Sequence, residues 1–375
     1  MNQLLLATTE GNVAAMESAS EGLRQVQQYN FSIGILAMLI VGFGFLMVFV
    51  KNYGFSALTG TYLLVAAALP VYLGLRSTGI ISAEAMAANS IEAFLFAEFA
   101  AASALIAMGA ILGRVKVYQY GILGALLVPF YMINEWLVLD GGLGITAGFV
   151  DAGGSIVIHA FGAYFGMGLA LVLSSAKHRE MPIESDATSD RFSMLGSMIL
   201  WIFWPSFCSA IVPEAQFAQT VINVVLALCG ATLCTYIVSL ILRKKIAIAD
   251  IANASLAGGV AIGATCNLVS GLGAFGIGMV AGTLCVIGYT IIQPRMQKAF
   301  KLVDTCGVHN LHGMPGLLGG LCGILVVPGA AKAQIVGILF TVAFALIAGV
   351  ISGMIIRATG KKELAYEDED EFLSE

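Results

Sequence analysis

Two segments of the chain place histidine within apolar sequence. Residues 151–168, DAGGSIVIHAFGAYFGMG, contain His159, and residues 304–320, DTCGVHNLHGMPGLLGG, contain His309 and His312. Each segment begins with an aspartate that is followed, after two residues, by a glycine. Ionisable side chains in lipid-compatible sequence are costly and usually functional. Two segments that each carry an imidazole into the membrane therefore predict one shared pathway.

We expect His159 and His309 to form a pair, because they stand at similar places in the two segments. One ring nitrogen of a neutral imidazole donates a hydrogen bond and the other accepts one. Two neutral rings that share a proton would offer an acceptor to a passing N–H group. A structural hydrogen bond is the alternative explanation for either histidine alone, and their paired occurrence favours the functional one.

The spacing of His309 and His312 also suits two metal ligands on one helical face. A metal site would need a third ligand and an open position, and no further histidine or thiolate is placed for it. We therefore expect neither a metal nor another cofactor, and an intramembrane metal enzyme is the weakest alternative. His178 lies in a charged loop and is expected to be solvated.

Asp151 and Asp304 stand where the two histidine segments begin. A carboxylate at a helix start accepts hydrogen bonds from backbone N–H groups and complements the helix dipole. For Asp151 these groups would belong to residues 152–154. Both aspartates are therefore predicted to be buried structural acids.

The composition predicts a polytopic membrane protein. Of the 375 residues, 59% are hydrophobic and 11% are charged, and the mean hydropathy is +0.91. No basic stripe indicates a nucleic-acid partner, and the N-terminus does not resemble a cleaved signal peptide. The seven cysteines lie in or beside apolar runs without a CxxC pair, which is typical of small buried side chains.

About eleven apolar runs reach the ~20 residues that a bilayer crossing needs. They cover approximately residues 30–50, 55–75, 91–113, 117–139, 152–176, 194–212, 219–242, 249–269, 273–292, 304–327 and 333–357. The charged segment 1–28 cannot span and is expected to be a surface helix or disordered. The segment 358–375 ends in the acidic stretch YEDEDEFLSE, residues 366–375, which is expected to be disordered.

The distribution of Lys and Arg predicts the orientation. With the N-terminus outside, all of the 18 basic residues except Arg24, Arg76 and Lys332 fall on the cytoplasmic side. Segment 1–28 would then be extracellular and the tail 358–375 cytoplasmic, in a protein of the plasma membrane.

The run count predicts two inverted repeats of five spans, at about residues 30–176 and 194–327, and a final helix at about 333–357. These elements form a transmembrane domain over residues 29–357. The histidine segments are the fifth and tenth spans. Inverted repeats place their substrate site where the repeats meet, near the bilayer midplane.

Three acidic residues, Glu98, Glu135 and Asp140, would lie toward the outer side in this topology. Acids at an outer vestibule can concentrate cations. Glu98 and Glu135 could instead pair with helix-end amides, and both interpretations stay open.

These segments closely resemble the Rh (Rhesus) branch of the ammonium transporter/Rh superfamily. The resemblance is carried by DAGGSIVIHAFGAYFG, WPSFCSAI, GAILGR, NASLAGGVAIG and DTCGVHNLHGMPG, and it covers nearly the whole chain. It implies an all-α polytopic membrane protein with eleven transmembrane helices in two inverted five-helix repeats plus a final helix. It also implies a homotrimer with one pore per subunit that conducts ammonia, ammonium or methylamine, and in some members carbon dioxide.

The resemblance also assigns residue roles in the pathway. His159 and His309 match the twin pore histidines, and Phe99 and Phe207 match the stacked phenylalanine gate. Composition alone would not single out these two among the 21 phenylalanines.

Three acids match family positions as well: Asp151 the buried structural acid, Asp140 an acid at the outer vestibule and Asp190 one near the cytoplasmic mouth. Leu139 stands where high-affinity ammonium transporters have a tryptophan, and Ile211 where they have a serine. Without the tryptophan a cation–π contribution of up to ~2 kcal/mol is missing, which implies weak cation recruitment.

The predicted function is conduction rather than catalysis: ammonium releases its proton at the outer gate and crosses as ammonia. A carbon dioxide channel is one alternative. The other is an ammonium sensor that signals through its cytoplasmic side.

Overall fold

The computed structural model describes residues 2–81 and 85–373, and within them the chain is helical without β-strands. Because the bilayer core holds no water, backbone N–H and C=O groups must find partners within the protein, and a helix satisfies them locally. The predicted all-α polytopic architecture is therefore confirmed.

The first half of the chain, up to the first histidine segment, contains nine elements. They are α1 (Asn2–Ala37), the π-helix η1 (Met38–Phe43), α2 (Gly44–Leu46), η2 (Met47–Phe49), α3 (Gly54–Thr78), α4 (Ile91–Ile111), α5 (Val117–Val138), the π-helix η3 (Ser155–Ala160) and α6 (Phe161–Leu173). Nearly every residue of α4 is buried, so this helix lies in the interior of the bundle.

The second half adds the remaining helices. They are α7 (Ala176–Glu180), α8 (Ala187–Ser209), η4 (Glu214–Gln216), α9 (Phe217–Arg243), α10 (Ile248–Ala254), α11 (Ala257–Ile262), η5 (Gly263–Thr265), α12 (Gly271–Ile287), the π-helix η6 (Gly288–Ile292), α13 (Gln293–Phe300), the π-helix η7 (His309–Gly313), α14 (Met314–Val326) and α15 (Ala331–Thr359).

Among the described residues, ten helices are long and apolar enough to cross a membrane. The remaining expected span, the tenth at residues 304–327, is represented by η7 and α14, which begin only at His309. Its first turn contains two histidines and Asn310, and these polar residues make it less apolar than the ten long helices. The count of eleven therefore agrees with the fold once this short element is included.

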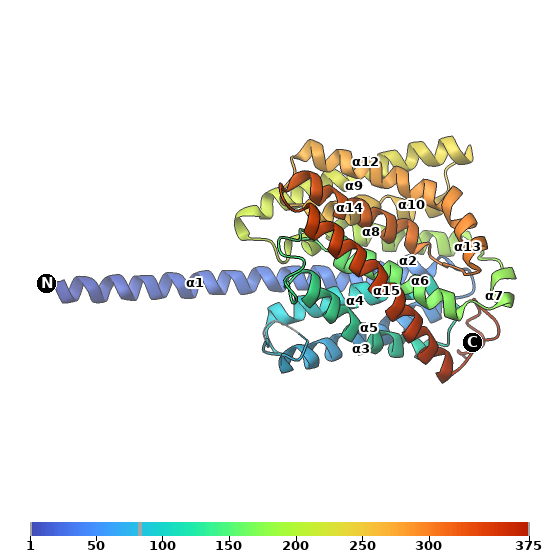
Figure 1. The fold of residues 1–375 in the computed structure, drawn as a ribbon, viewed down its shortest axis with the longest axis horizontal. Helices are drawn as coiled ribbons and strands as arrows, with labels where there is room; N and C mark the ends of the chain where they lie inside the picture. The colour runs from blue at the N-terminus through green and yellow to red at the C-terminus, as the bar shows by residue number, and fades with distance from the viewer. Residues whose placement is uncertain (1, 82–84, 374–375) are drawn as a thin grey trace.

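Corresponding contacts recur in the two halves. In the first half α3 packs on α5 and α4 on α6, and in the second α9 packs on α12 and α11 on α14. Figure 1 shows α15 running obliquely across the bundle, where it packs on α6. The α9–α12 pair is tight because Gly278 lies against the Ala227 carbonyl oxygen, where a Cβ would overlap it.

The N-terminal segment is helical and continuous with the first span. α1 extends well beyond the bundle before it enters it, at the end opposite the C-terminus (Figure 1). Arg24 forms an ion pair with Glu21 on its exposed surface. The predicted boundary at residue 28 therefore does not coincide with a break in the helix.

The expectation of a disordered C-terminal tail is wrong for the described residues up to 373. Asp368 accepts hydrogen bonds from the backbone nitrogens of Phe55, at 2.9 Å, and Ser56, at 2.8 Å, in the first turn of α3. Glu371 accepts one from Val117 N at 2.8 Å at the start of α5. The acids predicted to be solvated thus cap two helices and hold the tail against the bundle.

Replacing Asp368 with alanine should release this tail. Loss of the cap on α3 costs about 0.5–2 kcal/mol, so residues 361–373 should exchange backbone hydrogens faster in a mass-spectrometric measurement. The exposed neighbour Glu369→Ala is the matched control and should leave exchange unchanged. Equal exchange in the two variants would show that the cap does not hold the tail.

Candidate solute pathway

The first histidine segment begins with a buried carboxylate. Asp151, 4% exposed, accepts hydrogen bonds from Ile156 N at 3.0 Å and Val157 N at 2.8 Å. Between Asp151 and these two amides the chain turns at Gly154, whose φ of +74° lies in the left-handed region that glycine adopts without steric cost. Asp151 is a cap, as predicted, but for amides further along the chain than residues 152–154.

The second histidine segment repeats this arrangement. Asp304 is fully buried and accepts hydrogen bonds from Val308 N at 2.9 Å and His309 N at 3.0 Å. Gly307 has a φ of +70°. In both segments a π-helical turn follows the cap, an irregularity that is frequent at functional sites.

The residue paired with His159 is His312, and the expectation of His309 is wrong. The two Nδ1 atoms lie 3.3 Å apart. The ring centroids are 5.4 Å apart with 13° between the ring planes, so the rings lie edge to edge and nearly coplanar. His309 instead packs against Tyr164, with ring centroids 5.8 Å apart.

A signal for the correct pair is present in the sequence. His159 and His312 each follow the aspartate of their segment by eight residues, whereas His309 follows it by five. Since the two carboxylates anchor equivalent turns, equal spacing from the aspartate predicts which rings reach equivalent positions. Similar location within an apolar run did not distinguish the two candidates.

The short Nδ1–Nδ1 distance determines how protons are placed on two neutral rings. One Nδ1 must carry the proton and the other must accept it. The donor ring then has a bare Nε2, and the acceptor ring has an Nε2–H. The pair consequently presents one acceptor and one donor to its surroundings, and His159 Nε2 is buried without a protein partner.

Aromatic rings extend the histidine pair in both directions. On one side Phe207 lies 5.9 Å from His159 and 4.8 Å from Phe99, measured between ring centroids. On the other side Phe43 stacks on His312 at 6.3 Å. The five rings from Phe99 to Phe43 thus form a continuous row, the ring file. Phe99 and Phe207, the two predicted gate residues, meet edge to face at one end of it and are 2% and 3% exposed.

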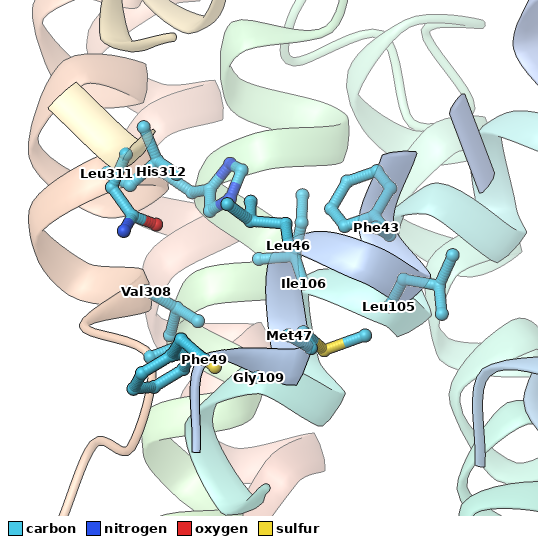
Figure 2. Close-up of a pocket in the computed structure, with 12 residues that line it drawn as sticks. Phe43, Leu46, Met47, Phe49, Leu105, Ile106, Gly109, Val308, Leu311 and His312 are labelled. Carbon is cyan, nitrogen blue, oxygen red and sulfur yellow. The ribbon is translucent and has the colours of Figure 1, made fainter. Parts of the chain in front are cut away.

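A small cavity adjoins each end of this file. The phenylalanine pocket, next to Phe99 and Phe207, is also lined by Leu139, Asp151 and Ile211. The methionine pocket, next to His312, has apolar walls that include Phe43, Leu46, Met47, Ile106 and Leu311 (Figure 2). Their volumes of about 10 and 20 Å³ correspond to roughly one water molecule each.

Glu98 does not line the vestibule, contrary to expectation. Its side chain is fully buried between α4 and α1, where Oε1 accepts a hydrogen bond from Ser32 Oγ at 3.0 Å. Neighbouring residues of a helix point in different directions, so Glu98 faces α1 whereas the adjacent Phe99 faces Phe207.

The other acids lie at the ends of helices. Glu135 lines the phenylalanine pocket and accepts a hydrogen bond from Tyr72 Oη at 2.7 Å. Asp140 is exposed just beyond Leu139 of this pocket, and Asp190 is half-buried in the first turn of α8. Among the described residues no group of three potential ligands could hold a metal ion.

Comparisons with known proteins agree with this geometry. The model of the Ammonium Transporter Family matches residues 14–374. Ammonium transporter Rh type B of Homo sapiens is 40% identical over 305 residues, which are 77% of this chain and 64% of that protein. The Mus musculus protein of the same name is 35% identical over 362 residues, covering 85% and 76%.

Solved structures show the same fold. The structure described as "Nitrosomonas europaea Rh50 and mechanism of conduction by Rhesus protein family of channels" has a TM-score of 0.93 and 59% identity, with 94% of this chain and 93% of that chain covered. A "Sensor Amt Protein" has a TM-score of 0.81 at 19% identity, with 94% and 98% covered, and supports the fold alone.

Fold and site together define a multi-pass helical membrane protein whose two broken helices bring paired imidazoles into a file of aromatic rings. The chain belongs to the ammonium transporter family, and within it to the Rh branch. It spans about 64% of the length of the human and other primate Rh type B relatives.

The histidine pairing can be tested by nitrogen-15 magnetic resonance in lipid bilayers, since the chain has only four histidines. We expect one Nδ1-protonated and one Nε2-protonated ring, joined through an Nδ1–H···Nδ1 hydrogen bond. His309→Leu should preserve that signal and His312→Leu should abolish it. The opposite result would restore His309 as the partner.

Proposed function

We propose that this chain conducts ammonia and methylamine as neutral molecules along the ring file from Phe99 to Phe43. The observation that carries the proposal is the continuity of that file: five side chains in ring-to-ring contact join the two pockets. Of the residues that line the methionine pocket, none is Lys, Arg, Asp or Glu.

The energetic argument favours a neutral solute. Moving a bare monovalent cation into a low-dielectric interior costs on the order of tens of kcal/mol. Removing the proton from an amine with a pKa of about 9 to 10 at neutral pH costs only ~3 to 4 kcal/mol, at about 1.36 kcal/mol per pH unit. Ammonium therefore gives up its proton before it passes Phe99 and Phe207.

The His159–His312 pair compensates part of the lost hydration of ammonia. The bare Nε2 of one ring accepts from an N–H of the solute, and the Nε2–H of the other donates to its lone pair. A net hydrogen bond contributes about 0.5–1.5 kcal/mol, enough to favour ammonia over an apolar gas of similar size without trapping it. Methylamine has the same polar groups, and its methyl group suits the apolar walls.

We infer the orientation of the protein in the membrane from the positions of its Lys and Arg residues. Because most Lys and Arg lie at the end of the bundle that also holds the C-terminus, we assign that end to the cytoplasm and the phenylalanine pocket to the outside. Asp140 then belongs to the outer vestibule and Asp190 to the cytoplasmic mouth. Localisation in the plasma membrane and assembly as a homotrimer with one pore per subunit are part of the same proposal.

The outer pocket is suited to weak recruitment of cations. Leu139 and Ile211, which replace the tryptophan and serine expected in high-affinity transporters, both line the phenylalanine pocket. Leucine and isoleucine provide neither a π face nor a hydroxyl acceptor for ammonium. The pocket therefore favours high throughput at high solute concentration over scavenging.

His312→Leu should slow ammonia entry into proteoliposomes by about five- to tenfold, since roughly 1 kcal/mol of hydrogen bonding to the solute is lost. Stopped-flow recording of internal pH measures this rate. His309→Leu is the matched control and should remain close to the unmodified protein.

Carbon dioxide, which has no N–H to donate, serves as the control solute in the same instrument. Its entry should not depend on His312. Unchanged ammonia entry in His312→Leu would remove the histidine pair from the mechanism, and a protein-dependent carbon dioxide flux would identify a gas channel of broader selectivity.

A further inference from the structure

A larger cavity lies away from the solute pathway, at the end of the bundle where α6 and α15 finish. Its walls come from the turn after α4, the α6–α7 junction, the last turn of α15 and the first residues of the tail. Its volume is about 310 Å³, which is within the range of small-ligand sites. The two pathway pockets are more than tenfold smaller.

The walls of this cavity are strongly basic. Five Lys or Arg residues line it, against one acid, Glu363. Lys177, Arg357 and Lys361 are exposed, and within the described part of the chain none of them forms an ion pair. Three mobile cations that converge on one cavity without carboxylate partners favour an anionic occupant.

Arg114 adds a fixed positive charge to the same cavity. Its guanidinium, 2% exposed, donates to Ser174 Oγ and the Val303 carbonyl, each at 2.6 Å, and to the Ala110 carbonyl. These acceptors are neutral, and no described Asp or Glu forms an ion pair with it. The buried Asp304 carboxylate attracts the guanidinium from beyond ion-pair distance. Because a buried charge without a contacting counterion is costly, an anion in the cavity would add to that stabilisation.

The C-terminal tail, which forms one wall of the cavity, is held in place by contacts that do not involve the three exposed cations. Lys362 Nζ pairs with Glu371 at 3.1 Å, and its carbonyl oxygen lies 3.1 Å from His178 Nε2. His178 is therefore buried rather than solvated as expected. Burial and the Arg114 charge lower the pKa of His178 below its usual value, so at neutral pH the imidazole is neutral.

We propose that this cavity binds a phosphate group, using Lys177, Arg357 and Lys361 as direct ligands and Arg114 as a fixed charge. A phosphate offers several oxygens that Lys and Arg contact at once through charge-assisted hydrogen bonds. Chloride would fill only a small part of the volume.

The position of the cavity favours the phosphate of an anionic lipid, because it lies where α6 and α15 end. Basic pockets between transmembrane helices at the cytoplasmic side bind such head groups. A free phosphate compound has the same chemistry and is the other source. The lipid source rests on the orientation proposed above, but not on what the pathway conducts.

The test compares thermal unfolding of the full-length protein in two settings. In nanodiscs, phosphatidylcholine alone is compared with phosphatidylcholine that contains phosphatidylglycerol. In phosphatidylcholine nanodiscs, inorganic phosphate and pyrophosphate are titrated into the buffer. A ligand that binds only the folded state raises the unfolding temperature, and retained phospholipid is identified by native mass spectrometry.

Lys177→Ala and Arg357→Ala should each weaken the binding by on the order of tenfold, and the double variant should abolish the stabilisation. Lys245→Ala and Lys298→Ala, exposed basic residues on other helix ends, are the matched controls. A lipid ligand is supported if phosphatidylglycerol stabilises the control variants but not the pocket variants. A soluble ligand is supported if inorganic phosphate or pyrophosphate gives this pattern instead.

The proposal is overturned if none of the three probes stabilises the protein. It is also overturned if the control variants lose the stabilisation as much as the pocket variants do, because the effect would then come from general surface charge. Unfolding temperatures of all variants in phosphatidylcholine alone show that each one is folded before probes are added.

Discussion

Two buried carboxylates make the proposed pathway possible. In a hydrocarbon environment a helix cannot begin in mid-membrane unless its first N–H groups are satisfied by the protein. Asp151 and Asp304 accept hydrogen bonds from such groups at the starts of η3 and η7. The chain can therefore turn at Gly154 and Gly307 and still enter a helix.

Because these turns lie inside the bundle, the two imidazoles that follow them reach the same place. His159 and His312 lie 3.3 Å apart, measured between their Nδ1 atoms. The rings of Phe207 and Phe43 lie against the two ends of the pair. In the proposed mechanism a solute at the histidine pair meets hydrogen-bonding groups but no charged side chain.

The elements that depend on hydropathy and local capping could be predicted from the sequence. Long apolar runs became helices, and the two aspartates became caps, because both outcomes follow from local chemistry. The position of a histidine along its apolar segment did not identify the partner of His159. The direction in which the side chain leaves the π-helical turn decides which ring reaches it. The equal spacing of eight residues from each aspartate to its histidine is the feature of the sequence that indicates the pair.

Tertiary contacts decided the remaining differences. The acidic tail looked like a solvated segment, but Asp368 and Glu371 found unsatisfied N–H groups at the starts of α3 and α5. Glu98 is adjacent to Phe99 in the chain and yet points toward Ser32. In each case the partner is distant in sequence, so composition and periodicity could not identify it.

The most direct test of the central claim, that the solute must lose a proton, is a comparison with potassium. Potassium has the charge of ammonium and nearly its size, but no proton to release. The account predicts that the protein accelerates ammonia entry into proteoliposomes while tracer uptake of rubidium, as a potassium analogue, stays at the level of protein-free liposomes. Rubidium uptake accelerated by the protein would contradict it, because an intact cation would then have crossed the ring file.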